Sequence, residues 1–308
     1  MSTSRITRSR RCARTRATAI SRSSRRSSTT AGSAIRTGLG GRLSTDTNLL
    51  NLNRLRGVGS HRLSLGTAWS KPFSGLIGDA FTFTASMRGD AYQTSDIQVS
   101  ANEPAQNPTV GRAYPQAALQ WRYPWLRQGE DYSQVIEPIV SFIAGPNGGN
   151  PPTISNEDSL AFDYNETQLF VPNRFAGLDQ VDPGDRVDYG LSAAIYPNHN
   201  TIRPGPLFSM LVGASYRFQN TSTFAVGSGL EDKQSDIVGR FIVSPRTYLD
   251  AVYRYRFSHK DFNGVRHEVG ISAGPPALRL GLSYVKLPAD LTSNDTARRE
   301  QIAASAAI

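Results

Sequence analysis

The feature that most constrains this chain is an alternation of apolar and polar residues with a period of two. Residues 80–91 place most apolar side chains at odd positions, and residues 208–218 place them at even positions. Successive side chains of a β-strand point to opposite faces, so each run predicts a strand with one apolar face. Runs of this kind predict about a dozen strands and no helix, over residues 62–69, 80–91, 116–123, 136–142, 186–196, 208–218, 237–243, 248–257, 267–273, 278–285 and 301–308.

Two all-β architectures fit such strands: a water-soluble sandwich or barrel, and an antiparallel transmembrane β-barrel. The runs extend over about 8–12 residues; a tilted membrane-spanning strand needs about 9–11, whereas soluble strands average nearer 5–6. Charged residues stand in the middle of the polar faces, as a wet lumen allows. Aromatic residues recur near strand ends, as in an interfacial girdle, at Trp69, Tyr92, Trp121, Tyr123, Trp125, Tyr196 and Tyr284. Together these features favour a partial transmembrane β-barrel.

The basic charge of the chain comes from its N-terminal end. Residues 1–45 contain 11 Arg and no Asp or Glu, so the remainder holds 34 − 11 = 23 basic against 25 acidic side chains. A nucleic-acid-binding domain carries its basic excess on the folded part, so we expect no nucleic-acid partner. No stretch of about 18 apolar residues predicts a membrane-spanning helix, and residues 1–32 lack the apolar core of a secretory signal.

Composition divides the chain after residue 37. We expect residues 1–37, rich in Arg and Ser, to be disordered, either as a natural tail or as a segment translated from a wrong start. A basic arm for nucleic acid or anionic lipid and an organelle transit peptide are alternatives. Residues 38–308 are then expected to form one partial barrel domain with a long loop at 145–185.

No catalytic or metal-binding motif stands in the chain, so we expect neither enzyme activity nor a cofactor. The one cysteine, Cys12, excludes an internal disulfide, and the four histidines lack metal-ligand spacing. Acidic residues gather between 157 and 188 without the spacing of a calcium loop, which favours a solvated acidic loop. Within it, Phe170 and Phe175 stand among turn formers beside Arg174, and we expect both rings to be buried and the arginine to be paired.

The loop and the strand after it carry the most specific pattern. Residues 137–159 read EPIVSFIAGPNGGNPPTISNEDS, and residues 169–191 read LFVPNRFAGLDQVDPGDRVDYGL. Together they resemble the C-terminal barrel domain of the LPS-assembly outer-membrane protein family, also called organic solvent tolerance protein or LptD, in its alphaproteobacterial form. The resemblance extends over residues 38–308, and in this stretch its main carriers are Asn156, Glu157, Asp158, Ser159, Phe170, Asn173, Arg174, Phe175, Gly177 and Asp179.

The resemblance implies an outer-membrane barrel of a Gram-negative bacterium that moves lipopolysaccharide to the outer leaflet without making or breaking a bond. The implied partners are lipopolysaccharide, outer-membrane lipids and a plug lipoprotein like LptE. A periplasmic bridge protein is implied only where a periplasmic jellyroll precedes the barrel. No jellyroll and no terminal aromatic residue stand in this sequence, so we expect a truncated form. A general porin-like channel and a soluble β protein with a nucleic-acid-binding arm remain alternatives.

In such a barrel the loop residues named above would fold in or over the lumen and help to seal it. The polar faces of the strands would line the lumen, where arginines could bind lipid phosphates. For any one of these charges, pairing with a neighbouring charge or with water is the more ordinary role. The lumen residues that we expect are Arg88, Asp90, Arg122, Glu137, Arg217, Arg254 and Arg256.

Overall fold

The computed structural model describes most of the chain after its first 23 residues. The described residues are 24–38, 40–55, 57–160, 162–199, 205–221, 223–246, 248–275, 277–287 and 299–307. Within them the backbone is almost entirely β-strand and loop, with one 3-10 turn, η1, at Glu166–Gln168. The all-β fold class is thus confirmed.

Fourteen strands are described, and they form one antiparallel sheet in which sequence neighbours pair along the path β1 to β14. Their bounds are β1 Ser24–Arg36, β2 Arg42–Arg54, β3 Gly59–Ser74, β4 Ala80–Ser95, β5 Thr109–Arg122, β6 Trp125–Gln128, β7 Tyr132–Ala144, β8 Arg186–Pro197, β9 Phe208–Arg217, β10 Ile237–Arg246, β11 Leu249–Phe257, β12 Gly264–Ala273, β13 Arg279–Leu287 and β14 Arg299–Ala307. The short β6 continues β5 along the same neighbour, β7. In the described chain β1 and β14 each pair on one side, so the sheet stays open.

The expectation of disorder over residues 1–37 is wrong for residues 24–36. These residues form β1, which pairs with β2 along its whole length, from Ser24 opposite Arg54 to Arg36 opposite Arg42. A ladder of backbone hydrogen bonds does not depend on a packed side-chain core, so a segment with few large apolar residues can still extend a sheet. The β domain therefore begins before residue 38, and residues 1–23 lie outside the described residues.

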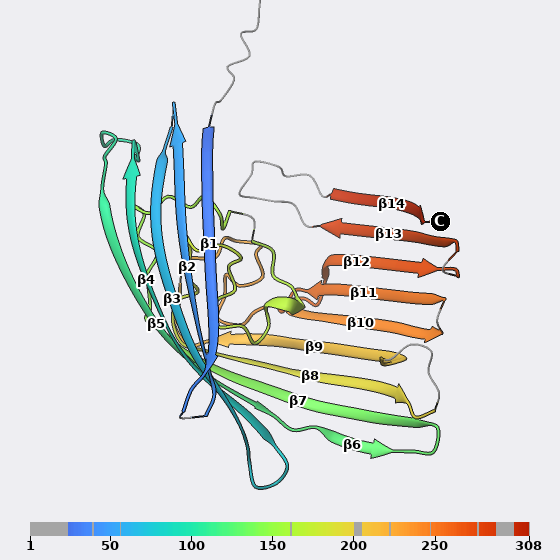
Figure 1. The fold of residues 1–308 in the computed structure, drawn as a ribbon. Coiled ribbons are helices and arrows are strands. Elements are labelled where there is room, and N and C mark those ends of the chain that lie inside the picture. Colours follow the sequence, from blue (N-terminus) through green and yellow to red (C-terminus); the bar gives the residue numbers. More distant parts are fainter. Residues whose placement is uncertain are drawn as a thin grey trace, which may run out of the picture.

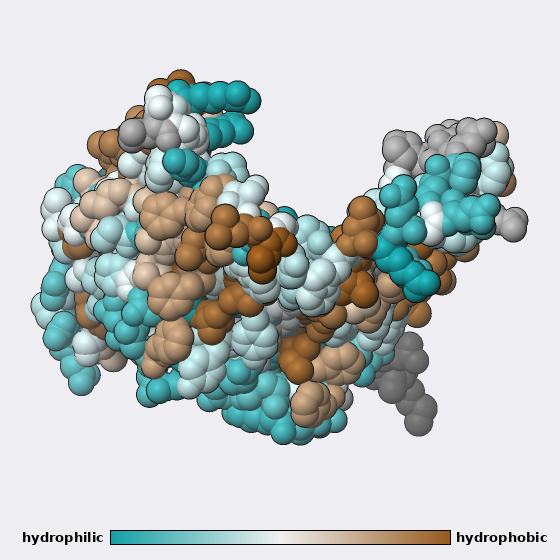
Figure 2. Space-filling model, turned by 90° about the horizontal axis from the view of Figure 1, so that it is seen from below, coloured by the Kyte–Doolittle hydropathy of each residue, from teal (hydrophilic) through white to brown (hydrophobic). Residues whose placement is uncertain are grey.

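The sheet curves (Figure 1), and its two faces differ in chemistry. Segment 145–185 lies on the concave side, where the strands present polar side chains to it. The convex side carries exposed apolar side chains at alternating positions. They include Leu49, Leu63, Leu65, Met87, Leu119, Val140, Phe142, Leu191, Val243, Ile271, Leu280 and Leu282. Figure 2 shows apolar residues in brown spread over the molecule as seen from below, among hydrophilic residues in teal.

The two ends of the sheet also differ. The three longest connections, 96–108, 145–185 and 218–236, all leave the sheet at the same end, because an antiparallel path alternates ends at each connection. The opposite end has tight connections such as 75–79 and 129–131. In outer-membrane barrels the periplasmic turns are short and the extracellular loops are long. We refer to the two ends as the long-loop end and the short-turn end.

Among the described residues, no helix has the length and apolar character needed to cross a membrane.

A pair of adjacent positions on β13 tests the assignment of the two faces. Leu282 is half exposed on the convex face, whereas the adjacent Ser283, opposite Gly270 of β12, is on the concave face. We expect Leu282→Arg to lower the free energy of unfolding in lipid vesicles by about 2–4 kcal/mol, because an arginine then faces lipid near mid-strand. Ser283→Arg should change it by less than about 1 kcal/mol, since it faces the lumen. Urea unfolding measures both, and equal effects would contradict the assignment.

Candidate functional site

Segment 145–185, between β7 and β8, is the largest structure on the concave face (Figure 1). Its two ends are bridged to each other. The Gly184 amide donates to the Pro146 carbonyl at 2.9 Å, and the Gly145 amide donates to Asp185 Oδ1 at 3.1 Å. Asn150 exchanges two hydrogen bonds of 2.8 Å with the backbone of Val181. The segment is therefore closed at its base, and several of its other polar groups bind the sheet.

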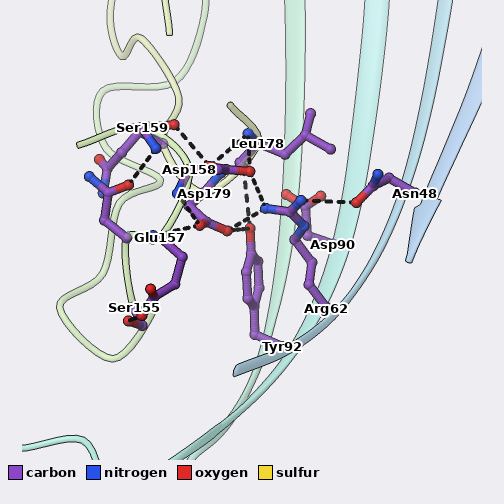
Figure 3. Close-up of polar contacts among 12 residues, drawn as sticks. Asn48, Arg62, Asp90, Tyr92, Ser155, Glu157, Asp158, Ser159, Leu178 and Asp179 are labelled. Atoms are coloured by element: carbon purple, nitrogen blue, oxygen red, sulfur yellow. Dashed lines mark hydrogen bonds and ion pairs between the residues drawn. The ribbon is translucent and has the colours of Figure 1, made fainter. Parts of the chain in front are cut away.

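The first contact with the sheet is an ion cluster around Arg62 of β3 (Figure 3). The guanidinium Nη1 of this buried arginine lies 2.7 Å from Asp158 Oδ2 and 2.5 Å from Asp179 Oδ1. Its Nη2 donates to Asn48 Oδ1 of β2 at 2.9 Å. One buried arginine of the sheet thus binds two parts of the segment that are about twenty positions apart in sequence.

The two carboxylates also hold the segment to itself. Asp158 accepts backbone hydrogen bonds from Leu178 and Asp179, each at 3.0 Å, and Asp179 Oδ2 accepts from the Glu157 amide at 2.8 Å. Gly177 stands where this crossing is tightest. A Cβ there would lie 2.1 Å from Asp158 Oδ1 and 2.5 Å from Ser159 Oγ. A side chain at residue 177 would therefore displace the Asp158 carboxylate.

The same contacts set the acidity of Asp158. Burial by itself would raise the pKa of this carboxyl, because it disfavours the charged form. Hydrogen bonds from the backbone of Leu178 and Asp179 and the charge of Arg62 outweigh that effect and hold the pKa of Asp158 well below its usual range. Asp158 is consequently ionised at neutral pH, as the pairing with Arg62 requires.

A second contact joins β4 and β5 to the same part of the segment. Arg112 donates to the Leu178 carbonyl at 2.6 Å and to the Asp179 carbonyl at 2.8 Å, and Arg88 donates to the Leu178 carbonyl at 3.0 Å. Asp90, which is buried, lies 2.6 Å from Arg112 and 3.2 Å from Arg88. Asp90 thus orients two arginines whose remaining donors satisfy carbonyls of the segment.

A third contact is a buried network at the C-terminal part of the segment. Arg174 lies 2.5 Å from Asp188 of β8 and 2.5 Å from Ser215 of β9. Asp182 lies 3.0 Å from Arg186 and 2.7 Å from Arg217. Burial tends to raise the pKa of Asp182, but Arg186, Arg174 and Arg217 together lower it. These ions are fully or almost fully buried, so each depends on its partners for solvation.

Apolar contacts complete the docking. Phe175 stacks on Phe224 of segment 218–236 with ring centroids 5.2 Å apart, and Phe162 packs on both rings. Phe224 belongs to a buried core, against which Phe162 and Phe175 pack. The other core residues are Tyr164, Leu169, Leu230 and Val238.

On the concave face of the sheet, two glycines that pair across β8 and β9 face the segment. They are Gly190 and Gly213. A Cβ at Gly213 would lie 2.9 Å from Leu169 Cδ1, and one at Gly190 would lie 3.2 Å from Phe170 Cζ. The glycines therefore allow the side chains of Leu169 and Phe170 to approach the backbone of the sheet closely.

The predicted loop residues all lie in this docked segment. Arg174 is paired, as expected, while Phe170 and Phe175 are half-buried rather than buried. Asn156 Oδ1 accepts from the Ser159 amide at 2.9 Å, and Asn173 Oδ1 accepts from the Asp182 amide at 3.1 Å. The expectation of a solvated acidic loop is wrong, because most of its carboxylates are paired with arginines. Glu157 pairs with Arg54, and Asp158, Asp179 and Asp182 pair as described above. Asp163 pairs with Arg266 and Glu166 with Arg254, whereas Asp185 accepts hydrogen bonds from the Gly145 amide and Gln219.

The predicted lumen residues fall into two groups. Arg88, Arg217 and Arg256 contact the docked segments, and Asp90 acts on them through Arg88 and Arg112. Arg217 binds Asp182 and the Pro183 carbonyl, and Arg256 donates to the Ser228 carbonyl at 2.5 Å. The other group is more open. Arg254 is one-third exposed and pairs with Glu166 and Glu268, and Arg122 is 45% exposed and pairs with Glu137.

Sequence reasoning missed Arg62 and Arg112 as wall residues, and it missed the role of Arg186. Each stands inside a predicted or observed strand on the polar side of the alternation. Arg112 has Asp90 directly opposite on the neighbouring strand, and Arg186 has Asp188 two residues along on the same face, so a nearby carboxylate was the signal for these two arginines. Within the described residues no group of three or more His, Cys, Asp or Glu could hold a metal ion.

A comparison with known protein families identifies the family of this chain. The family model described as LPS transport system D, LptD, matches residues 21–308. The chain belongs to the LptD family. LptD proteins are outer-membrane β-barrels of Gram-negative bacteria that transport lipopolysaccharide, and they are not enzymes. The resemblance and the barrel fold class are thereby confirmed, and the family implies lipopolysaccharide and LptE as partners. No curated protein matches the chain.

Removal of Arg174 tests the third contact. We expect Arg174→Ala to destabilise the folded chain by about 3–5 kcal/mol, because it leaves Asp188 buried without its closest cation. Arg122→Ala, which breaks an ion pair whose arginine is 45% exposed, should cost less than about 1 kcal/mol. Urea unfolding with limited trypsin digestion of segment 145–185 measures both. Equal, small effects in the two variants would contradict the buried network.

Acid titration tests the first contact. Because the pKa of Asp158 is lowered in the folded state, its contribution to stability is complete above the ordinary Asp value of about 3.9 and is lost as the pH falls below that value. The stability difference between the wild type and Asp158→Asn should therefore be largest at neutral pH and shrink below about pH 4. Asp131→Asn, at an exposed turn residue, serves as the control and should show no such trend in its urea midpoint.

Proposed function

We propose that this chain acts as the outer-membrane barrel component that moves lipopolysaccharide to the outer leaflet, with segment 145–185 sealing the lumen from inside. The observation that carries this proposal is the separation of chemistry across one sheet. Apolar side chains face outward from the convex side, and a wall of paired charges faces a docked segment on the concave side.

A transporter of an amphiphile needs a polar route for the sugar head and a lateral route for the acyl chains. A lumen lined by Arg88, Asp90, Arg122, Glu137, Arg217, Arg254 and Arg256 would supply the polar route. Their contacts and exposure place these arginines in two groups. Arg88, Arg217 and Arg256 hold docked segments, whereas the more exposed Arg122 and Arg254 remain accessible to the phosphates of a lipid head.

The proposed loop residues have a sealing role. Asn156, Glu157, Asp158 and Ser159 form one side of the crossing at Gly177, and Asn173, Arg174 and Asp179 bind the wall or the segment itself. Phe170 and Phe175 close the apolar side of the docked segment. An LptE-like lipoprotein is the proposed protein partner, and outer-membrane lipids surround the convex face.

A general porin-like channel is the less favoured function. A water-filled pore needs an open lumen, and the docked segment occupies the concave side of the part of the sheet that it binds (Figure 1). A soluble protein with a nucleic-acid-binding arm is disfavoured by the exposed apolar belt of the convex face.

Surface display of lipopolysaccharide tests the proposal. In cells depleted of their own LPS-assembly barrel protein, the expressed chain should restore modification of lipid A by an outer-leaflet enzyme. Arg174→Ala should reduce that signal by roughly tenfold or more, because loss of the buried ion network destabilises the docked segment on which the proposed transport depends. Arg122→Ala should leave insertion unchanged and is the matched variant for the accessible arginines.

Two results would count against lipid transport. One is a chain that inserts as a heat-modifiable barrel while surface lipopolysaccharide stays absent. The other is steady ion conductance of the reconstituted chain without any lipid movement, which would favour the porin-like alternative.

A further inference from the structure

The hairpin of β3 and β4 ends in an apolar turn at the short-turn end. The two strands pair along their whole length, from Gly59 opposite Ser95 to Ser74 opposite Ala80. In Figure 1 their turn reaches below the other strands. Leu76 is fully exposed and Ile77 is 67% exposed, and no residue from 72 to 78 is charged. A rigid hairpin thus presents two aliphatic side chains side by side.

The turn is held in a fixed shape. The Gly75 amide donates to the Asp79 carbonyl at 2.8 Å, and Gly78 has a φ of 89°, which favours glycine. The buried Asp79 accepts a hydrogen bond of 3.0 Å from the Trp121 ring of β5. The exposure of Leu76 and Ile77 is therefore a property of an ordered turn that is tied to the neighbouring strand.

An aromatic cluster lies at the same level as this turn. Phe73 stacks on Phe81 at 5.2 Å, and Tyr123 lies 5.5 Å from Trp125 and 6.2 Å from Trp121. Tyr123 also borders Gly78, since a Cβ on that glycine would lie 4.0 Å from the Tyr123 ring. Trp125 and Leu126 are more than half exposed. Aromatic belts of this kind mark the headgroup level of a membrane.

The apolar face of β4 places the turn at that level. Its convex-side residues from Phe81 to Ala91 carry no charge. At about 3.3 Å per residue and a tilt of about 40°, this stretch extends over about 25–28 Å, the height of the apolar band of an outer-membrane barrel. Leu76 and Ile77 follow at its edge, a few residues beyond Phe81.

We propose that Leu76 and Ile77 form a lipid anchor that inserts among the headgroups and first acyl carbons of the phospholipid leaflet at the short-turn end. The anchor is continuous with the lipid-facing convex surface through Phe73 and Phe81, and it fixes the depth of the β3–β4 hairpin. This inference rests on the membrane insertion that the proposed function assumes.

Depth-resolved quenching tests the anchor. In the full chain with Cys12→Ser, an environment-sensitive fluorophore is placed at Leu76→Cys, Met87→Cys or Glu130→Cys, in phosphatidylethanolamine and phosphatidylglycerol vesicles with brominated acyl chains. The label at residue 76 should be quenched roughly twofold more by bromine near the headgroup than by deep bromine, because interfacial groups lie only about 5–10 Å deep. The label at 87, near the middle of the apolar face of β4, should show the reverse order, and the label at 130, in an exposed turn at the same end, should show no quenching.

The labels at residues 76, 87 and 130 distinguish failure of the anchor from failure of membrane insertion. A quenched label at 87 with an unquenched label at 76 would overturn the anchor and leave the barrel intact. A label at 76 that is shielded from aqueous iodide but not quenched by bromolipid would indicate a protein contact and would also overturn it. If the label at 87 is unquenched, the chain has not inserted, and the barrel function and the anchor fail together.

A second experiment places no label at the anchor. Leu76→Ser with Ile77→Ser removes exposed side chains only, so folding should persist. The label at 87 should then change its depth profile, with a loss of the preference for deep bromine. Leu55→Ser, at a leucine of the long-loop end that is 84% exposed, is the matched control and should leave that profile unchanged. An unchanged profile in the double variant would contradict the anchor.

Discussion

The rest of this structure depends on buried arginines that join the concave face of the sheet to one segment. Arg62 and Arg112 project from the sheet to carboxylates and carbonyls of segment 145–185. Arg174 projects in the opposite direction, from the segment to Asp188 and Ser215 of the sheet. An ion in such a place is costly unless its partners are complete. The segment can therefore dock in one arrangement with little tolerance, which is the property that a seal requires.

The same network explains why the chain carries a long polar loop inside a curved sheet. Half of every strand must be polar if the other half faces lipid, and those polar faces need partners where water is excluded. Segment 145–185 supplies carbonyls and carboxylates to β3, β4 and β5 on one side and to β8 and β9 on the other. Apolar packing of Phe175 on Phe224 joins a second loop to the first. The loops and the wall thus form one folded unit.

The sequence predicted the strands wherever the alternation was clean, because one face meets lipid and the other does not. It missed β2, where Leu49 is exposed and the adjacent Leu50 is buried, since apolar residues on both faces remove the period of two. It missed β1 because backbone pairing leaves no hydrophobic signature. Which arginine meets which carboxylate could not be predicted, because those contacts join residues about a hundred positions apart, as Arg62 and Asp158 are.

Segment 145–185 is a fixed part of the inner face of the sheet. Hydrogen exchange of the folded chain in lipid tests this most directly, since the amides of Asp158, Leu178 and Asp179 donate to the carboxylates of Asp158 and Asp179 when the segment is docked. We expect these amides to exchange as slowly as those of β4 and β8, through opening of the whole unit. Exchange at the rate of an unstructured peptide, with the strands still protected, would contradict it.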